Sequence, residues 1–420
     1  MTVKEEVPAI LNGSPAVTLT DPELERWPLL GKEEEEAVLE VLRHGDLSLH
    51  PVTRKLEEDY KHYFGMQYAL AHCNGTAALL AAYFALNFQR GDEVLVPSAT
   101  HWASVVPMLW VGLVPVFCES EQTYLGLDPE DVERKITPRT KAMTVVHLFG
   151  MPSNMDALLA LAKKYRLKII EDASHAQGAS WRGKQCGTFG DLSVFSLQTS
   201  KLAPAGEGGM LLSNDPLLME RAMCLGDIYR ILELETSAQR FAGTSFGIKT
   251  RMAPLSAAVA RVQLKKLFVH NQQRKKNLIC LSQKLSELGF QTFLPPAYVE
   301  RVYFEYLITY DEKKGKISRD LLIKALLAEG CKIEYPRYPL LHQMPLFTEG
   351  HALTIAGVDT LPNFPLPKYL PNALPKTEAA QQCLLKLPVF QNSPKELLDQ
   401  YGKAFSKVLQ HAEQISLVIG

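Results

Sequence analysis

The sequence lacks the features that mark several specialised classes of protein. Its charges almost balance, with 45 Lys and Arg against 46 Asp and Glu, so no basic field favours nucleic acid or an anionic membrane. The seven cysteines are odd in number and include no C-x-x-C pair, which is typical of neither a disulfide framework nor a zinc site and indicates a reducing compartment. We therefore expect a cytoplasmic protein with no metal site.

Long apolar stretches are missing as well. The longest, residues 103–118, is broken by two prolines and a glycine and is too short to span a bilayer, so we expect buried helix and strand there. Residues 1–20 hold no uninterrupted apolar segment of the kind that a signal peptide needs. The expected partners are therefore small molecules or a second copy of the chain, with no nucleic acid and no membrane.

What is present is the composition of an ordinary globular chain. Its 420 residues, 46% of them hydrophobic, suffice for two or three domains. Short apolar strands alternate with helical patterns, which predicts an α/β fold: a mostly parallel central sheet flanked by helices on both faces. We expect an N-terminal arm over 1–25, a large α/β domain over 26–265 and a smaller C-terminal α+β domain over 266–420.

Individual elements can be assigned along the chain from hydrophobic periodicity and turn residues. Helices are expected at 32–45, 52–65, 74–86, 100–112, 155–166, 216–226, 251–289, 318–330 and 395–414. Strands are expected within 67–73, 91–100, 113–119, 141–150, 167–179, 210–215, 301–311 and 331–339. Residues 227–247 are expected to form a loop and 361–376 a proline-rich connector.

Polar residues gather where the predicted strands end. Because the carboxyl ends of parallel strands meet at one edge of the sheet, a site is expected there. The residues that follow these strands are 74–76, 100–102, His147, Asp172 and His175. For His147, a hydrogen-bonded histidine inside the core is an equally good interpretation.

Asn74, Gly75 and Thr76 join a predicted strand to an alanine-rich helix. The free N–H groups at such a helix start, together with the Thr76 hydroxyl, form a ready site for an anion. A plain strand-to-helix turn capped by Asn74 is the alternative. The junction carries neither a Walker loop nor a G-x-G-x-x-G fingerprint, so a phosphate group smaller than a dinucleotide is favoured.

Lys201 lies in a glycine-rich stretch, 196–210, whose glycines permit close approach of the backbone and positive φ. Taken alone, it would be interpreted as a solvated surface lysine, because lysines are mostly exposed. Asp172, expected at a strand end, could keep a heterocyclic nitrogen protonated. With the phosphate site at 74–76, these residues form the set of parts that holds pyridoxal 5′-phosphate: a Schiff-base lysine, an acid partner for the ring nitrogen and a phosphate cup.

In these motifs the sequence resembles the DegT/DnrJ/StrS group of sugar and cyclitol aminotransferases, which are fold-type I pyridoxal-phosphate enzymes. The resemblance extends from about Trp27 to Phe405. It rests on NGTAAL (74–79), GDEVLVPSATHWAS (91–104), HLFGMPSNMD (147–156), EDASHAQGA (171–179), GKQCGTFGD (183–191), FSLQTSKLAPAGEGGM (195–210) and TRMAPLSAAVARVQL (250–264).

The resemblance implies a role for each matching residue. Lys201 corresponds to the family's Schiff-base lysine, which also moves the proton as general base and acid. Asp172 corresponds to the partner of the pyridine nitrogen. Gly75, Thr76 and Ser196 correspond to the ligands of the cofactor's phosphate.

Three further positions depart from the usual pattern of that family. His101 stands where an aromatic residue stacks on the cofactor ring, with Trp102 as the alternate. His175 stands where relatives often have a glutamine that approaches the cofactor's 3′-oxygen. Lys249 stands where relatives often have an asparagine that reaches the phosphate in the neighbouring subunit.

The implied activity is transfer of an amino group from glutamate or glutamine to a cyclic keto-sugar or keto-cyclitol, by a ping-pong mechanism, in secondary-metabolite or cell-surface sugar biosynthesis. A nucleotide-linked keto-hexose is the rival acceptor. Two further interpretations are a pyridoxal-phosphate sugar dehydratase, against which the retained Lys201 counts, and a non-catalytic regulatory protein. A homodimer with shared active sites is implied, with acceptor contacts expected from loops 227–247 and 335–350.

Overall fold

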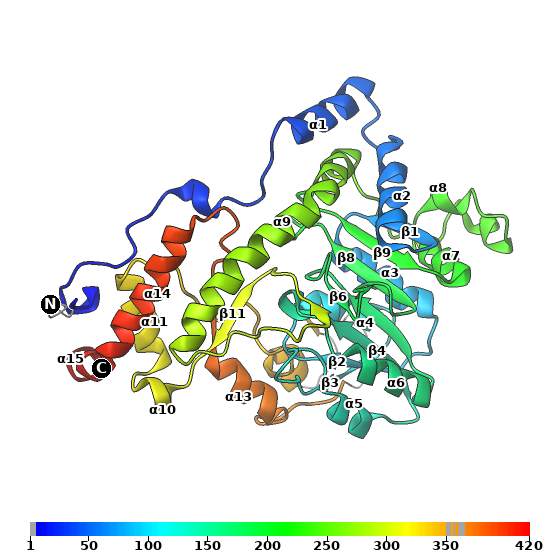
Figure 1. The fold of residues 1–420 in the computed structure, drawn as a ribbon. Coiled ribbons are helices and arrows are strands. Elements are labelled where there is room, and N and C mark those ends of the chain that lie inside the picture. The colour runs from blue at the N-terminus through cyan, green and yellow to red at the C-terminus, as the bar shows by residue number, and fades with distance from the viewer. Residues whose placement is uncertain (1–5, 350–353, 356–357, 360–365) are drawn as a thin grey trace.

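A seven-stranded sheet forms the centre of the computed structural model, which describes residues 6–349, 354–355, 358–359 and 366–420 (Figure 1). The strand order is β1-β9-β8-β5-β4-β2-β3. Their bounds are β1 Tyr68–His72, β2 Glu93–Pro97, β3 Val114–Cys118, β4 Thr140–Val146, β5 Lys168–Asp172, β8 Leu192–Ser196 and β9 Gly209–Ser213. All neighbours are parallel except β9, which runs antiparallel to both β1 and β8. The mostly parallel sheet confirms the expected fold class.

Helices cover both faces of this sheet. Along β2, Leu95 belongs to one core whereas Val94 and Val96 belong to the other, because alternate side chains of a strand point to opposite faces. The first core is covered by α1 (Lys32–His44), α2 (Val52–Phe64), α5 (Pro129–Lys135), α6 (Met155–Tyr165) and the first half of α9 (Pro254–Glu287). The second is covered by α3 (Gly75–Leu86), α4 (Val106–Trp110) and α7 (Pro216–Cys224).

A third core surrounds the other half of α9. Leu264 and Leu267 of this helix belong to the first sheet core, whereas Leu278 and Leu285 belong to the third. The third core is built with β11 (Tyr306–Thr309), β14 (Leu384–Leu387), α11 (Arg319–Ala328), α14 (Lys395–Gln410) and α15 (Ala412–Ile419). α9 is continuous across the predicted domain boundary at residue 265, so the division of the chain into domains stays a prediction.

The remaining described strands and α-helices are short. They are β6 (Ser180–Trp181), β7 (Lys184–Gln185), α8 (Ile228–Ile231), β10 (Val299–Glu300), α10 (Glu312–Gly315), α12 (Pro345–Thr348), β12 (Thr354–Ile355), β13 (Val358–Asp359) and α13 (Pro375–Cys383). No helix in the described ranges combines the length and the apolar character that crossing a membrane requires.

Two local expectations differ from the structure. The strand expected over 331–339 is irregular apart from a single bridge between Glu334 and Lys386, because Pro336 and Pro339 supply no N–H for a strand ladder. The loop expected over 227–247 contains α8 and a 3₁₀ turn, although most of it is irregular. Part of the proline-rich connector, residues 361–365, lies outside the described residues.

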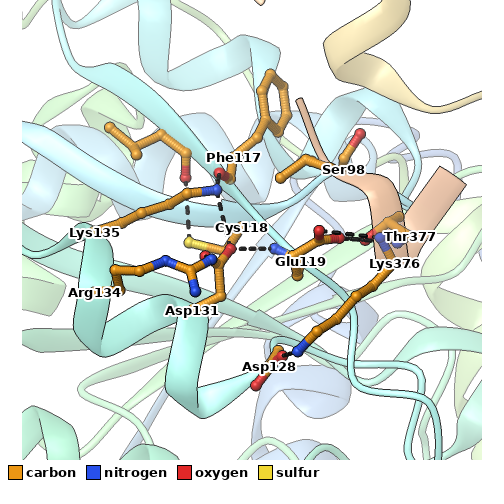
Figure 2. Close-up of polar contacts among 12 residues, drawn as sticks. Ser98, Phe117, Cys118, Glu119, Asp128, Asp131, Arg134, Lys135, Lys376 and Thr377 are labelled. Atoms are coloured by element: carbon orange, nitrogen blue, oxygen red, sulfur yellow. Dashed lines mark hydrogen bonds and ion pairs between the residues drawn. The ribbon is translucent and has the colours of Figure 1, made fainter. Parts of the chain in front are cut away.

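A buried carboxylate ties α13 to the edge of the central sheet (Figure 2). Glu119, directly after β3, accepts hydrogen bonds from the backbone N–H of Lys376 at 3.1 Å and of Thr377 at 2.8 Å. The Thr377 hydroxyl donates to the same carboxylate at 2.6 Å. Asp131 in turn accepts from the Glu119 N–H at 2.6 Å. Glu119 therefore caps the first turn of α13, where free N–H groups and the helix dipole favour a negative charge.

Replacing Glu119 with glutamine should lower the free energy of unfolding by about 2 kcal/mol, because an amide loses one acceptor and the charge that strengthens the bonds to α13. Urea denaturation of the variant measures this difference. Glu130→Gln is the matched control. Glu130 is exposed on α5, and its substitution removes the same charge nearby. Equal stability of the two variants would contradict the assigned cap.

Candidate active site

One cavity of about 430 Å³ opens where β1, β8, β5 and β2 reach their carboxyl ends. It is lined by eight of the nine residues that were predicted for the site. These are Gly75, Thr76, His101, Trp102, Asp172, His175, Ser196 and Lys201. The sheet brings them together because β1, β8, β5 and β2 run in the same direction.

The start of α3 forms one end of the cavity. Asn74 caps the helix by accepting the N–H of Ala77 at 2.8 Å, which leaves the N–H groups of the first turn without partners inside the helix. A side chain at Gly75 would not fit, because its Cβ would lie 2.9 Å from the Cβ of Ser196. The Thr76 and Ser196 side chains line the same end. This cradle suits a small oxyanion such as a phosphate.

Asp172 ends β5 and is buried in the wall of the cavity. The Ser104 hydroxyl donates to its Oδ2 at 2.6 Å, and the Ser174 N–H donates to its Oδ1 at 3.1 Å. Thr100 and Ser104 are hydrogen-bonded through their hydroxyls at 3.0 Å. These donors orient the carboxylate and stabilise its charge, as an acid partner for a protonated ring nitrogen requires.

Lys201 lies in the loop between β8 and β9, opposite this carboxylate. Its Nζ is 4.2 Å from the centre of the Phe304 ring, and it makes no hydrogen bond or ion pair with any described residue. The pKa of Lys201 is lowered to about 8, chiefly by burial; the negative charge of Asp172 opposes this shift and the positive charge of Arg337 adds to it. Such an amine is free for part of the time near neutral pH, so it can act as a nucleophile or a base.

The glycines after Lys201 behave as the sequence predicts. Gly206 has a φ of +80°, a conformation that side chains disfavour. At Gly209 a Cβ would lie 2.4 Å from the carbonyl oxygen of Asn74. The loop therefore returns directly against the start of α3, which brings the lysine loop and the anion cradle together.

His101 and Trp102 both lie on the rim of the cavity. The Nδ1 of His101 accepts the N–H of Ala103 at 3.2 Å. Its ring lies 5.0 Å from that of Trp102, at 35°, and meets the edge of Tyr338 at 5.7 Å. Burial lowers the pKa of His101, and Lys201 lowers it further, so the ring is neutral. Both rings can present a face to a planar ligand, and the choice between them stays a prediction.

His175 is held on the opposite side by aromatic neighbours. It stacks on Phe304 with ring centres 4.0 Å apart. Its Nδ1 accepts the N–H of Phe149 at 3.3 Å, and its Nε2 lies 3.1 Å from the Tyr338 hydroxyl. Because Nδ1 is an acceptor, Nε2 carries the proton and donates to Tyr338. Burial holds the pKa of His175 well below its usual range, so it is a neutral donor.

Two further candidates lie away from the cavity. Lys249 is exposed and does not line it, so within one chain it reaches no cavity ligand. His147 is fully buried, with Nδ1 accepting the N–H of Ser153 at 3.1 Å and Nε2 2.9 Å from Glu171. The second interpretation of His147, a hydrogen-bonded core histidine, therefore fits the structure.

The structure adds wall residues that the motifs did not indicate. Phe304, Arg337 and Tyr338 reach the site from the C-terminal third of the chain. The Arg337 guanidinium pairs with the buried carboxylate of Glu305 and lies 5.6 Å from the Phe304 ring. Residues 337–339 of the loop 335–350 line this cavity, whereas no residue of 227–247 lines it in one chain. The expected contacts of both loops with an acceptor stay a prediction.

Comparison with protein families gives one match over most of the chain. The model of the DegT/DnrJ/EryC1/StrS aminotransferase family matches residues 28–400. An L-glutamine:2-deoxy-scyllo-inosose aminotransferase of Micromonospora echinospora is 33% identical, and the match covers 81% of this chain and 85% of that protein. A GDP-perosamine synthase of Caulobacter vibrioides is 34% identical over 69% of this chain and 77% of its own length.

A solved structure shares the fold over nearly the whole chain. The aminotransferase from Psychrobacter cryohalolentis superposes with a TM-score of 0.81 at 25% identity. The superposition covers 92% of this chain and 99% of that protein. The central sheet and the C-terminal core are therefore both part of the shared architecture.

Proposed function

The chain belongs to the DegT/DnrJ/EryC1/StrS family of sugar and cyclitol aminotransferases, and we propose that it transfers an amino group from glutamine or glutamate to a ring ketone of a cyclitol, with pyridoxal phosphate bound in the cavity. The observation that carries this proposal is the arrangement of Lys201, Asp172 and the start of α3 around one cavity. The family's enzymes depend on pyridoxal phosphate.

The residues present fit that cofactor. The cradle at Gly75 excludes a side chain and leaves room for a phosphate beside Thr76 and Ser196. Asp172 offers a buried, hydrogen-bonded carboxylate in the cavity wall as a partner for a ring nitrogen, and Lys201 offers an amine without a partner among the described residues. When bound, pyridoxal phosphate supplies an electron sink for negative charge that develops on the substrate.

Lys201 is the residue placed to move the proton. Its Nζ can take a proton from the amino-bearing carbon of the donor and return it on the cofactor side, because the lowered pKa leaves the amine free. The Arg337 guanidinium, on the wall beside Phe304, is placed to hold the donor's carboxylate. Trp102 and Tyr338 line the same cavity.

The rate should therefore depend on pH in a defined direction. Below a pKa of about 8 the Lys201 amine is protonated and cannot accept a proton, and above it the amine is free. At saturating donor, kcat should rise through about pH 8 and then level off. A pH profile of kcat measures this. A flat profile across that range would contradict Lys201 as the base.

The acceptor is proposed from two relatives. The name of the Micromonospora echinospora relative specifies L-glutamine and a deoxy-inosose, whereas the name of the Caulobacter vibrioides relative specifies a GDP-linked product. The cyclitol ketone is favoured because the cyclitol enzyme matches more of this chain. A nucleotide-linked keto-hexose is the second candidate.

A panel of ketone acceptors tests the function. The full-length protein is loaded with pyridoxal phosphate, converted with glutamine or glutamate, and then mixed with 2-deoxy-scyllo-inosose or with a GDP-linked keto-hexose. Amination of the cyclitol, with return of the visible absorbance of the cofactor form present before donor was added, supports the proposal. Amination of only the nucleotide sugar would show that the acceptor is a nucleotide-linked keto-hexose and not a cyclitol. Loss of water without amination would indicate a dehydratase. Failure of the protein to bind pyridoxal phosphate would contradict the proposed function as a whole.

We also propose that the active unit is a homodimer. Lys249 is exposed beside apolar side chains that water would not stabilise, Phe246 at 70% and Ile248 at 43% exposure. Covering them with a second copy would bury this apolar surface, and Lys249 would then lie at the interface between the two copies. Sedimentation should give a dimer, and Lys249→Ala should weaken cofactor binding. An active monomer would contradict the proposal.

A further inference from the structure

The segment that joins the N-terminal arm to α1 contacts the backbone of Lys201. The Trp27 Nε1–H donates to the carbonyl oxygen of Lys201 at 3.0 Å. Within the described ranges this carbonyl accepts from no other group. Figure 1 shows the arm running past α14 and alongside α9 before α1 begins, so Trp27 reaches the loop after a long path over the C-terminal core.

The indole is itself held by a buried cation. The Arg274 guanidinium on α9 lies 4.0 Å from the centre of the Trp27 ring, and its side chain is almost fully buried. It donates to Gln391 and, at 3.2 Å, to the carbonyl of Tyr303, and it has no carboxylate within 4 Å among the described residues. The His270 ring meets the Trp27 ring in a T-shaped contact, with ring centres 5.3 Å apart.

A buried guanidinium without a counter-ion is costly unless its surroundings stabilise it. The face of an indole is the best aromatic partner for a cation. The same contact draws electron density toward the cation, which makes the indole N–H a stronger donor. Arg274, Trp27 and the Lys201 carbonyl thus form one chain of contacts from α9 to the active-site loop.

We propose that Trp27 is a positioning residue for Lys201: its indole N–H fixes the Lys201 carbonyl, and the guanidinium of Arg274 fixes the indole. The inference rests on the proposed role of Lys201. The hydrogen bond to its carbonyl restrains rotation of the Lys201 backbone, and the side chain is held over the Phe304 ring. Small displacements of a reacting group lower rates steeply. The hydrogen bond from Trp27 to the Lys201 carbonyl therefore affects the reaction rate although it lies outside the cavity.

The arm is anchored firmly enough to serve as a support. Glu329, fully buried, accepts the N–H groups of Ala9 at 2.7 Å and Ala16 at 2.7 Å. Lys407 pairs with the same carboxylate at 2.9 Å. Nearer to the site, the Gln263 side chain donates to the carbonyl of Leu29 at 3.0 Å. The chain is therefore anchored both before and after Trp27.

Two variants test the inference. Trp27→Phe removes the N–H but keeps an aromatic face for Arg274, and 3-benzothienylalanine at position 27 replaces the N–H with sulfur in a ring system of the same shape. The matched control is Trp110→Phe, because Trp110 is exposed on α4 and does not line the cavity. All three are compared with the wild type as full-length chains.

Two measurements are made on each protein. In the cofactor-free chain, labelling of Lys201 with fluorodinitrobenzene across a pH series, followed by peptide mapping, gives the pKa of the amine directly. In the loaded enzyme, kcat and the KM for the donor are separated. For both variants at position 27 we expect the labelling midpoint to rise by about half a unit or more, and kcat to fall about tenfold with KM unchanged.

A labelling midpoint or a kcat equal to that of the wild type in the benzothienyl protein would overturn the inference, even if its melting temperature fell. A change of similar size in Trp110→Phe would overturn it as well. Failure of the proposed function is distinguishable from these outcomes, because it would appear as full turnover in Lys201→Ala, whereas the labelling of Lys201 needs no turnover.

Discussion

Lys201→Ala should lower kcat by about 10⁴-fold, the upper range for loss of a group that transfers the proton in the reaction. The amine is the one placed between Phe304 and the cavity interior, and an alanine offers neither nucleophile nor base. The change should leave the fold intact, because the lysine amine makes no bond to any described residue. Single-turnover conversion of the donor measures the loss.

Lys201→Arg separates the chemistry from the charge. Arginine keeps a cation in the cavity but has a pKa too high to release its proton, so it should be as inactive as alanine. Lys314→Ala is the surface control, since the Lys314 side chain is 82% exposed. Retention of a substantial part of the turnover in Lys201→Ala would remove the basis of the proposed mechanism.

Asp172→Asn should lower kcat by about 10²–10³-fold, which is the usual cost of removing one group that stabilises developing charge. Asparagine has nearly the same shape and can still accept from Ser104 through its oxygen. It has no charge, however, so it cannot keep a ring nitrogen protonated. The loss should appear in kcat and in the visible spectrum of the loaded protein. The melting temperature should fall as well, because the amide leaves the Ser174 N–H without its acceptor.

Asp156→Asn provides the comparison for that variant. Asp156 is half-exposed and pairs with Arg182, and its side chain is outside the cavity. Its substitution should change surface electrostatics without altering turnover. If Asp156→Asn and Asp172→Asn had equal activities, the charge of Asp172 would have no part in the reaction.

The parts of the site that follow strands could be predicted from the sequence, for a physical reason. The carboxyl ends of parallel strands meet at one edge of the sheet, so the pattern that predicts β1 and β5 also places the start of α3 at the same edge as Asp172. The Lys201 loop joins this edge because β8 and β9 are adjacent. Such proximity depends on the order of elements and not on the details of packing.

The positions of Phe304 and Arg337 in the wall of the cavity could not be predicted from the order of the strands. Phe304 and Arg337 lie in irregular segments of the C-terminal part, where no periodicity places them against the sheet. Trp27 meets Lys201 across 174 positions of sequence. These contacts arise only when the C-terminal core and the arm dock on the sheet, and neither composition nor spacing reports that docking.

Histidine roles were the hardest to assign in advance. A histidine after a strand can be a ligand or a core residue, and only its hydrogen-bond partners decide. His147 meets Glu171 inside the core, whereas His175 faces the cavity and donates to Tyr338. The same local pattern therefore gives two different outcomes, determined by neighbours that are distant in sequence.

The position of β9 bears on the order in which the site forms during synthesis. β9 is inserted antiparallel between β1 and β8 and is the last strand of the central sheet in chain order. The central sheet is therefore complete at Ser213. A chain that leaves the ribosome N-terminus first therefore has the anion cradle, Asp172 and Lys201 before Arg337 is made. We infer that the half of the pocket that would hold the cofactor is translated before the wall that would select the substrate.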